Sequence, residues 1–203
     1  MSPPLDSQAA PGAPVDVRLP AEQTMPVVFA SPHSGAAYPP EFLAASRLDA
    51  FALRKSEDSF VDEIFAAAPA LGAPLLRALF PRAYIDPNRE PFELDPAMFE
   101  DELPAYANTA SPRVAAGLGT IARVVASGEE IYGGKLNFAE ATARLERCYR
   151  PYHDALRRVA SVAACWSTAT RCPRSAGRWS ATPGANASTS SSAIATPAPA
   201  PPP

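Results

Sequence analysis

A histidine follows an apolar segment near the start of this chain, at a place where α/β enzymes keep reactive side chains. Residues Val27–Phe29 are β-branched or aromatic and predict a short buried strand. The polar turn Ser31–Gly35, which carries His33, ends that strand. Ligands of open α/β sheets bind outside the carboxyl ends of strands, so His33 is expected to face a crevice. The alternative is an ordinary loop histidine that only hydrogen-bonds its surroundings.

Two further clusters carry carboxylate and guanidinium groups. Residues 56–63 (Ser-Glu-Asp-Ser-Phe-Val-Asp-Glu) lie at a turn or at the start of a helix, and residues 80–89 (Phe-Pro-Arg-Ala-Tyr-Ile-Asp-Pro-Asn-Arg) run from a strand into a polar turn. Each has an ordinary structural explanation. An acidic pair can cap a helix, Asp-Pro-Asn is a common turn, and an arginine after a turn is usually solvated. Only their order along the chain and their spacing favour a shared site.

Helix and strand patterns alternate in the middle of the chain and favour an α/β fold. A strand is predicted over 74–80, followed by a short apolar segment at 83–85, and helices are predicted over 111–127 and 138–160. The second helix is expected to bury one face, formed by Phe138, Ala141, Leu145, Cys148 and Tyr149. Helical spacing also occurs between residues 48 and 65, at Phe51, Phe60, Val61, Ile64 and Phe65.

Composition divides the 203 residues into three regions. Residues 1–24 are rich in proline and alanine and are expected to form a disordered arm, whereas 25–160 have the pattern of a globular domain. Every acidic residue lies at or before Asp154, and the last leucine is Leu156. Residues 161–203 consist largely of Pro, Ser, Ala and Thr, which bury too little apolar surface to offset the entropy of ordering, so this tail is expected to be disordered.

Charge and cysteine content exclude several classes of function. The net charge of −3 gives no basic surface for nucleic acid, and no apolar run approaches the ~18–20 residues of a membrane helix. The first residues are neither basic nor apolar, so no secretory signal is predicted. Three cysteines, at 148, 165 and 172, show no paired spacing typical of disulfides or zinc sites. We expect a cytoplasmic protein with no nucleic-acid or membrane partner.

Considered together, the clusters resemble the N-formylglutamate amidohydrolase (N-formylglutamate deformylase) family, a zinc-peptidase-like group that includes enzymes of histidine degradation. The resemblance covers about residues 25–157. The motifs that carry it, in order, are Ser31–Gly35 (S-P-H-S-G), Glu57–Glu63 (E-D-x-x-V-D-E), Pro81–Arg89 (P-R-x-Y-I-D-x-N-R), Ile131-Tyr132, and Arg147–His153 (R-x-Y-x-P-Y-H). It implies a zinc-peptidase-like α/β fold, with a mixed or parallel sheet flanked by helices.

The resemblance also implies a reaction and a cofactor. The family hydrolyses N-formyl-L-glutamate to formate and glutamate, and a zinc ion supplies the nucleophile by lowering the pKa of bound water to about 7. His33 is the implied first ligand, and Glu57 or Asp58 is the second. Asp58 is favoured because a related branch of the family carries D-T-D-W at this place, which matches the aspartate.

The substrate is a small dicarboxylate, so fixed cations are expected beside the metal. The resemblance implies that Arg89 binds a carboxylate in bidentate fashion, that Asn88 donates alongside it and that Asp86 orients the arginine. Arg82 is a weaker candidate for the same task. A structural role is expected for His153. The general base is not identified among these residues and is expected in a part of the family domain that this chain lacks.

Two strings typical of the family's second half, L-V-D-C-H-S-M-P-S and V-L-G-D-R, are absent from the chain. Allowed codons for Trp166–Arg174, read from one nucleotide earlier, encode the first string in full, and Ser188–Ala195 can be shifted into x-D-x-V-L-G-D-R. This predicts a frameshift upstream of Trp166, either genuine or a sequencing error, with the loss of a metal ligand. We therefore expect this polypeptide to be inactive or nearly so.

Two other interpretations stay open at this point. The chain could be a non-catalytic α/β module whose proline-rich tail binds a partner, in which case it should bind no zinc. It could also be a hydrolase of another N-acyl amino acid, because the pocket for the acyl group would be built partly from residues that are missing.

Overall fold

Three strands form a mixed sheet at the centre of the computed structural model, which describes residues 12–167 and side chains as far as residue 161. The strands are β1 (Val15–Arg18), β2 (Phe29–Ser31) and β3 (Leu75–Ala78). Their order is β1-β3-β2, with β3 antiparallel to β1 and parallel to β2. All four residues of β3 are buried, as expected for a central strand. The predicted strand at 74–80 is thus confirmed.

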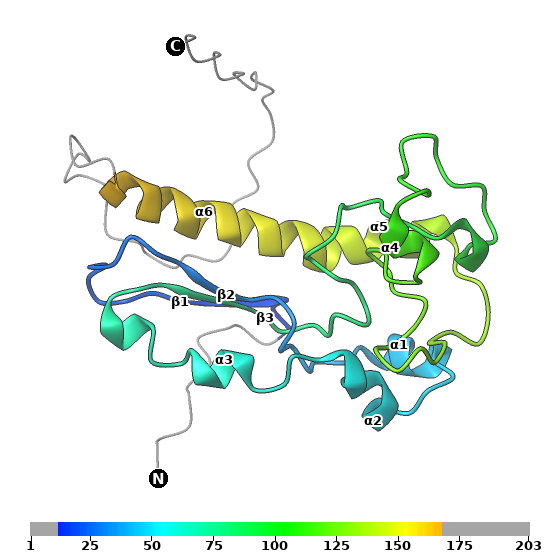
Figure 1. Cartoon of the computed structure of the whole chain (residues 1–203), viewed down its shortest axis with the longest axis horizontal. Helices are drawn as coiled ribbons and strands as arrows, with labels where there is room; N and C mark the ends of the chain where they lie inside the picture. Colours follow the sequence, from blue (N-terminus) through cyan, green and yellow to red (C-terminus); the bar gives the residue numbers. More distant parts are fainter. Residues whose placement is uncertain (1–11, 168–203) are drawn as a thin grey trace. The chain divides into compact units, whose positions relative to one another are not determined.

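Helices cover the sheet and extend beyond it (Figure 1). The α-helices are α1 (Pro40–Ala45), α2 (Ala50–Leu53), α3 (Val61–Ile64), α4 (Pro112–Ala115), α5 (Phe138–Arg144) and α6 (Arg150–Ser167). Shorter turns are the 3₁₀ helices η1 (Arg54–Ser56), η2 (Pro69–Leu71) and η3 (Pro96–Met98) and the π-helical turn η4 (Leu145–Tyr149). Long helix α6 contacts β1 and β3 and runs along the sheet, and Figure 1 shows α3 on the opposite side.

The segments α5, η4 and α6 follow one another without a break and confirm the helix predicted over 138–160. The helix begins where the Asn137 side chain accepts the backbone N–H of Glu140 (2.9 Å), as an N-cap residue does. Its predicted inner face is buried at Ala141, Leu145 and Cys148. Leu145 and Cys148 belong to the hydrophobic cluster around β3, and Ala141 belongs to the cluster around the 92–99 loop.

The N-terminal arm predicted over 1–24 is wrong for its central part, because β1 lies within it. Val15 and Val17 pack against the core, while Asp16 is buried and accepts hydrogen bonds from Arg77 of β3 (3.1 Å from Nε). An ion pair across two strands therefore stabilises a segment whose composition indicates disorder. Residues 1–11 lie outside the described part of the chain.

Two other boundaries differ from the sequence prediction. The predicted strand at Val27–Phe29 begins instead at Phe29, because only Phe29–Ser31 pairs with β3, and Val27 is exposed. The helix predicted over 111–127 ends after one turn as α4, since Gly117 adopts a left-handed conformation (φ 75°) that stops it.

The predicted disordered tail begins too early, because α6 continues through Ser167. Residues 168–203, which include most of the segments on which the frameshift prediction depends, lie outside the described residues. Within residues 12–167, no helix combines the length and the apolarity needed to cross a membrane.

The helical spacing between 48 and 65 does not produce one amphipathic helix. The chain turns at residues 57–60, between η1 and α3, so the apolar side chains do not share a buried face. Phe51, Phe60 and Ile64 are among the most exposed large apolar side chains of the described region. The apolar residues of this segment thus form an exposed surface.

Candidate functional site

The imidazole of His33 lies between two carboxylates that come from distant parts of the sequence. Its Nδ1 is 3.2 Å from Asp58 Oδ2, and its Nε2 is 2.8 Å from Asp86 Oδ1. His33 follows β2, Asp58 precedes α3, and Asp86 follows β3, so the ends of two parallel strands bring these groups together. The ring is almost fully buried, whereas the Asp58 side chain is half exposed. One side of the cluster is therefore accessible to solvent.

Hydrogen bonds between the first two clusters hold the His33 turn against the Asp58 turn. Ser34 Oγ donates to the carbonyl of Asp58 (2.8 Å), and the Asp58 N–H donates to the carbonyl of His33 (3.1 Å). Ser31 Oγ and Ser34 Oγ are 2.7 Å apart. The serines of the Ser-Pro-His-Ser-Gly motif therefore fix where His33 and Asp58 lie relative to each other.

Gly35 allows the third cluster to approach the first. A Cβ at this position would lie 2.3 Å from the carbonyl oxygen of Phe80, which no side chain tolerates. Two residues later, the N–H of Ala37 donates to the carbonyl of Leu79 (2.9 Å). The glycine thus lets the segment after His33 run directly beside the segment that leads to Asp86.

Asp86 is the most highly connected carboxylate of the site. Besides the contact with His33, it accepts hydrogen bonds from Arg82 Nη2 (2.8 Å) and from the N–H of Asn88 (2.8 Å). Arg89 Nη2 lies 3.6 Å from its Oδ2. Burial alone would raise its pKa, but the hydrogen bond to His33, the charges of His33 and Arg82 and the bond from Asn88 lower the pKa to about 2. Asp86 is therefore an anion at any physiological pH.

The two arginines of the third cluster differ in how free their guanidinium groups are. Arg89 donates from Nε to the carbonyl of Leu118 (3.0 Å) and from Nη1 to the carbonyl of Asn88 (2.8 Å). Arg82 bonds Asp86, lies 3.7 Å from Asp58 and is 25% exposed, against 12% for Arg89. The side chain of Asn88 is exposed beside them. The structure thus places Arg82 nearer to the open side of the cluster.

Glu57, the other candidate metal ligand, is directed elsewhere. Its carboxylate accepts hydrogen bonds from Tyr38 Oη (2.7 Å), Arg54 Nε (3.0 Å) and Ser59 Oγ (3.2 Å), and its side chain is only 2% exposed. Burial, together with the neighbouring Glu57 carboxylate, raises the pKa of Tyr38, so this tyrosine stays a donor. The structure brings Asp58, and not Glu57, to His33.

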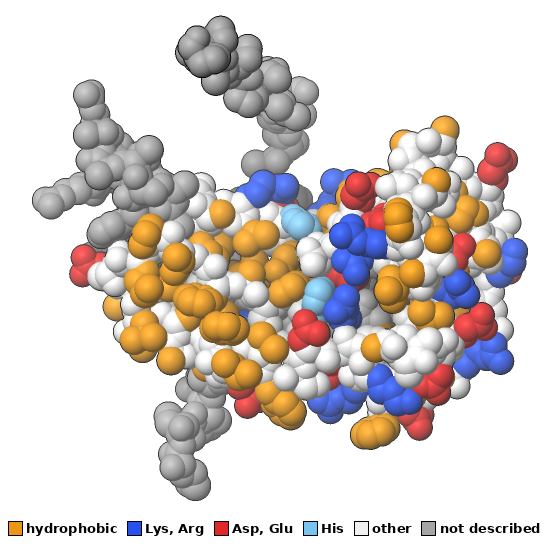
Figure 2. Space-filling view, viewed as in Figure 1, with side chains coloured by type: hydrophobic (Ala, Val, Ile, Leu, Met, Phe, Trp, Pro, Cys, Tyr) orange, Lys and Arg blue, Asp and Glu red, His pale blue; other side chains and the backbone are white. Residues whose placement is uncertain are grey.

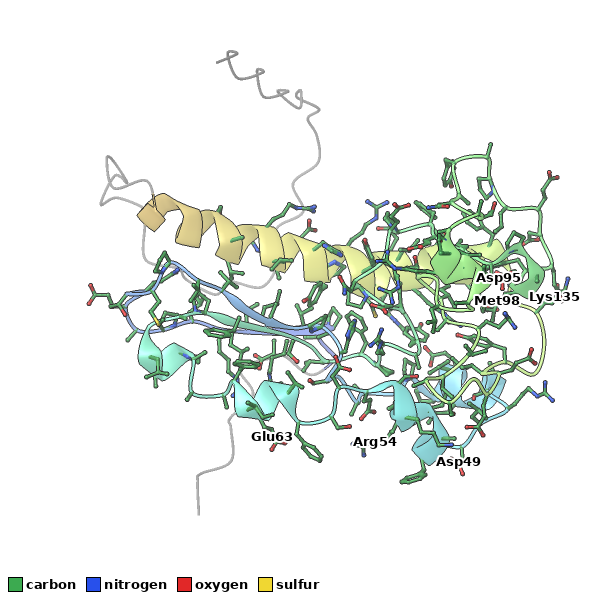
Figure 3. The ribbon with its side chains drawn as sticks, viewed as in Figure 1. Asp49, Arg54, Glu63, Asp95, Met98 and Lys135 are labelled. Carbon is green, nitrogen blue, oxygen red and sulfur yellow. The ribbon has the colours of Figure 1, made fainter. Side chains whose placement is uncertain are left out.

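The last residue of the second motif also lies apart from the cluster. Glu63 is exposed on α3 and points away from the sheet (Figure 3). The contact between His33 and Asp86, in contrast, was not foreseen, because Asp86 was interpreted only as the partner of an arginine. The available signal was its position directly after a buried strand-like segment, where an ionised side chain needs a partner.

His153 supports the site without contacting the His33 cluster. Its Nε2 is 2.9 Å from the carbonyl of Pro87, and Tyr149, one turn earlier, donates from Oη to the carbonyl of Arg89 (2.6 Å). Burial and the nearby carboxylates of Glu90 and Asp86 raise the pKa of Tyr149, which keeps its hydroxyl protonated. The helical segment of 138–167 thereby fixes both sides of the Asn88 turn, in agreement with the structural role expected for His153.

Replacing Tyr149 by phenylalanine should weaken this support. The variant leaves the Arg89 carbonyl without its donor and should lower the free energy of unfolding by about 1 kcal/mol. Urea unfolding at neutral pH measures this change. The matched control is Tyr106→Phe, since Tyr106 is a tyrosine that is 65% exposed. Equal stability of the Tyr149 variant and the wild type would show that the contact with Arg89 does not hold the turn.

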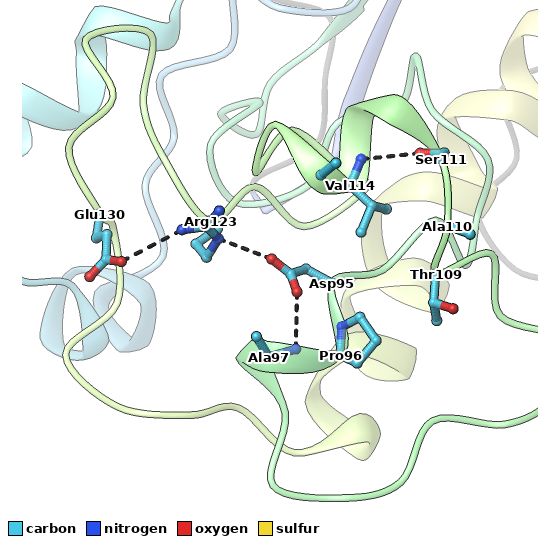
Figure 4. A pocket seen from close by; sticks show the side chains of 10 residues that line it. Asp95, Pro96, Ala97, Thr109, Ala110, Ser111, Val114, Arg123 and Glu130 are labelled. Atoms are coloured by element: carbon cyan, nitrogen blue, oxygen red, sulfur yellow. Dashed lines mark hydrogen bonds and ion pairs between the residues drawn. The ribbon is translucent and has the colours of Figure 1, made fainter.

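A hollow of about 550 Å³ elsewhere in the described region is a separate feature. It is lined by Asp95, Ser111, Arg123 and Glu130 among others (Figure 4). Its charges are paired with each other, because Arg123 Nε donates to Asp95 (3.0 Å) and its Nη1 lies 3.6 Å from Glu130. It contains no residue of the His33 cluster, so its size is no argument for catalysis there.

Comparison with known proteins shows the family to which the chain belongs. A mixed α/β fold, with a histidine, carboxylates and arginines gathered where its parallel strands end, is consistent with an amidohydrolase. The chain belongs to the N-formylglutamate amidohydrolase family, whose model matches residues 25–171. The family expectation drawn from the motifs is thus confirmed. No protein of curated function matches the chain.

A solved structure adds a measure of how much of the domain is present. The N-formylglutamate amidohydrolase from Ralstonia eutropha JMP134 is 38% identical to this chain, with a TM-score of 0.70. The similarity covers 77% of this chain but only 54% of that protein. The chain therefore spans about half the length of this relative.

Proposed function

We propose that the His33 cluster serves the hydrolysis of N-formyl-L-glutamate to formate and L-glutamate, on a zinc-peptidase-like fold. The observation that carries the proposal is the position of the His33 ring between Asp58 and Asp86, with Arg82 beside both carboxylates. This combination provides an imidazole and a carboxylate for a metal ion and a cation for an anionic substrate. Membership of the amidohydrolase family supports the reaction class.

The donor atoms fit two positions of a zinc site. Two ligands of a tetrahedral zinc, each about 2.0–2.1 Å from the metal, lie about 3.3 Å from each other. His33 Nδ1 and Asp58 Oδ2 are 3.2 Å apart, so they would hold a zinc ion with little movement. When bound, such an ion supplies a hydroxide-like water near neutral pH. Among residues 12–161, however, no three His, Cys, Asp or Glu side chains are grouped to hold a metal.

Asp86 determines which nitrogen of His33 is free to bind. Because Asp86 is an anion, it accepts a hydrogen bond from Nε2 of His33 at 2.8 Å, so Nδ1, on the side of Asp58, is the nitrogen that would bind a metal ion. A carboxylate that holds the outer nitrogen of a metal-binding histidine fixes the tautomer and raises the basicity of the ligand. Asp86 is therefore proposed to orient His33 as well as the arginines.

The arginines are proposed to bind the carboxylates of the substrate. Arg82 is partly exposed and lies next to Asp58, so it can reach a substrate held there. Arg89 bonds two backbone carbonyls and is held rigidly, with Asn88 exposed beside it. A rigid guanidinium loses little entropy on binding a carboxylate. We assign carboxylate binding to Arg82 and Arg89 together, with Asn88 as an additional donor.

The 203-residue chain alone should show little of this activity. Two metal ligands and no identified general base predict formate release at least about 100-fold slower than by the full-length Ralstonia eutropha enzyme, given the usual cost of an incomplete metal site. The test is a formate assay with zinc added, with N-formyl-L-glutamate and other N-acyl amino acids as substrates. Hydrolysis within tenfold of the full-length enzyme would refute the prediction.

The frameshift remains a prediction that a different experiment decides. The nucleotide sequence around codons 155–166 shows directly whether a family-like second half continues in another frame. An intact frame, with no family-like alternative downstream, would contradict it. Restoring the shifted frame should then restore formate release, if the proposed reaction is correct.

A further inference from the structure

The sheet ends at β2 on the side of the His33 cluster. The N–H of Phe29 donates to the carbonyl of Pro74 (2.9 Å), so the backbone N–H and C=O of Phe29 point toward β3. Backbone groups alternate in direction along a strand, and those of Ala30 therefore point to the open edge. Ala30 is exposed, and no strand of the described region pairs with this edge. An unpaired strand edge is a template for another strand.

Large apolar side chains are exposed on β2, on the segment before it and on the helical segment that packs against it. The exposed ones on β2, its approach and the α3–η2 segment, here called the β2 surface, are Met25, Val27, Phe60, Ile64, Phe65 and Leu71. The rings of Phe65 and Phe29 stack with centroids 5.0 Å apart, which joins α3 to β2. Figure 2 shows apolar side chains gathered over the half of the molecule that holds the sheet, with the two histidines at their border. Such a grouping is typical of an interface.

Phe60 gives a second indication of a missing partner. Among the non-glycine residues of the described region it alone has a positive φ (66°), and its ring is 61% exposed. A left-handed conformation costs a non-glycine residue roughly 1–2 kcal/mol. Within this chain, an exposed ring offsets none of that cost. Burial of the ring against a partner would do so.

We infer that the β2 surface is the docking site for the remainder of an N-formylglutamate amidohydrolase domain, which adds a strand at Ala30 and covers Phe60. The length of the Ralstonia eutropha protein indicates what occupies the β2 surface. About 46% of that protein lies outside the similarity, whereas the sheet in the described part of this chain has three strands. The position of the site agrees. Asp58 is half exposed beside this surface, so the docked segment would close the open side of the His33 cluster. The inference depends on family membership and not on the proposed reaction.

The test supplies the missing part as a separate polypeptide. The full 203-residue chain is refolded together with the portion of the Ralstonia eutropha protein that lies outside the similarity, and complex formation is measured by analytical ultracentrifugation and by titration of a labelled chain. We expect a one-to-one complex. Ala30→Pro, which removes the outward N–H, and Phe60→Asn, which tolerates the left-handed backbone, should each weaken it by about tenfold or more.

Phe51→Asn is the matched control, because Phe51 is an equally exposed phenylalanine on α2, outside the β2 surface, and its loss should not change binding. Phe60→Asn should also leave the unfolding free energy of the isolated chain unchanged or higher, which separates a binding effect from misfolding. Absence of a complex, equal weakening by Phe51→Asn, or a homodimer that Phe60→Asn converts to monomers would each overturn the inference. A complex that forms but releases no formate would instead count against the proposed reaction.

Discussion

Replacing Asp58 by alanine is expected to weaken zinc binding by the chain about 10- to 100-fold while changing its stability by less than about 1 kcal/mol. The carboxylate lies 3.2 Å from His33 Nδ1, at ligand spacing, so its removal leaves the histidine as a single ligand. Its side chain is 51% exposed, and its contact with Arg82 is 3.7 Å, so the fold depends little on it. Competition with a zinc-binding dye measures the affinity, and urea unfolding measures the stability.

The neighbouring acid provides the matched variant with the opposite expectation. Glu57→Ala should leave zinc affinity unchanged but lower the unfolding free energy by about 2 kcal/mol, because it removes the buried acceptor of Tyr38 and Arg54. The two variants differ by one position in the chain, so general disturbance of the loop would affect both alike. If Glu57→Ala lost zinc and Asp58→Ala did not, the assignment of the ligand would be reversed.

The contrast between these two acids shows what sequence reasoning could and could not reach. Motif order indicated that His33, an adjacent acid and the Asp86–Arg89 turn belong together, since parallel strands end at one edge of a sheet. Which of two consecutive acids turns toward His33 depends on the backbone of a non-repetitive turn, and the partners of Glu57 lie at Tyr38 and Arg54. Only the comparison with a related motif favoured Asp58 in advance.

The errors in the fold have a common physical origin. β1 was missed because its stability comes from pairing with β3 and from the contact of Asp16 with Arg77, both remote in sequence. The helical spacing of Phe60 and Ile64 was noted in the sequence, but these side chains are exposed in the structure, because apolar spacing does not show which polypeptide will cover them. On the inference above, those residues do become buried, against the part of the domain that this chain lacks.

Asp86→Asn is expected to be the most damaging single change within the site. The carboxylate accepts from His33, Arg82 and the Asn88 N–H; an amide at the same place keeps only one acceptor oxygen, presents an NH₂ donor to another of these donors and loses the charge. The pKa of Asp86 is about 2 in the folded chain, against 3.8 for a free aspartate, so its ionised form stabilises the fold by about 2 kcal/mol at neutral pH. The variant should lose about that amount.

The pH dependence identifies the cause of this loss. A depressed pKa contributes stability that is complete above the unfolded value and disappears as the pH falls through the folded value. The difference between wild type and Asp86→Asn should therefore be complete at about pH 5 and shrink between about pH 4 and about pH 2. Urea unfolding at a series of pH values measures it, with Glu63→Gln, an exposed acid on α3, as the control that should show no such difference. A difference that stayed constant down to pH 2 would mean that Asp86 acts through packing, and its proposed hold on the His33 tautomer would lose its electrostatic basis.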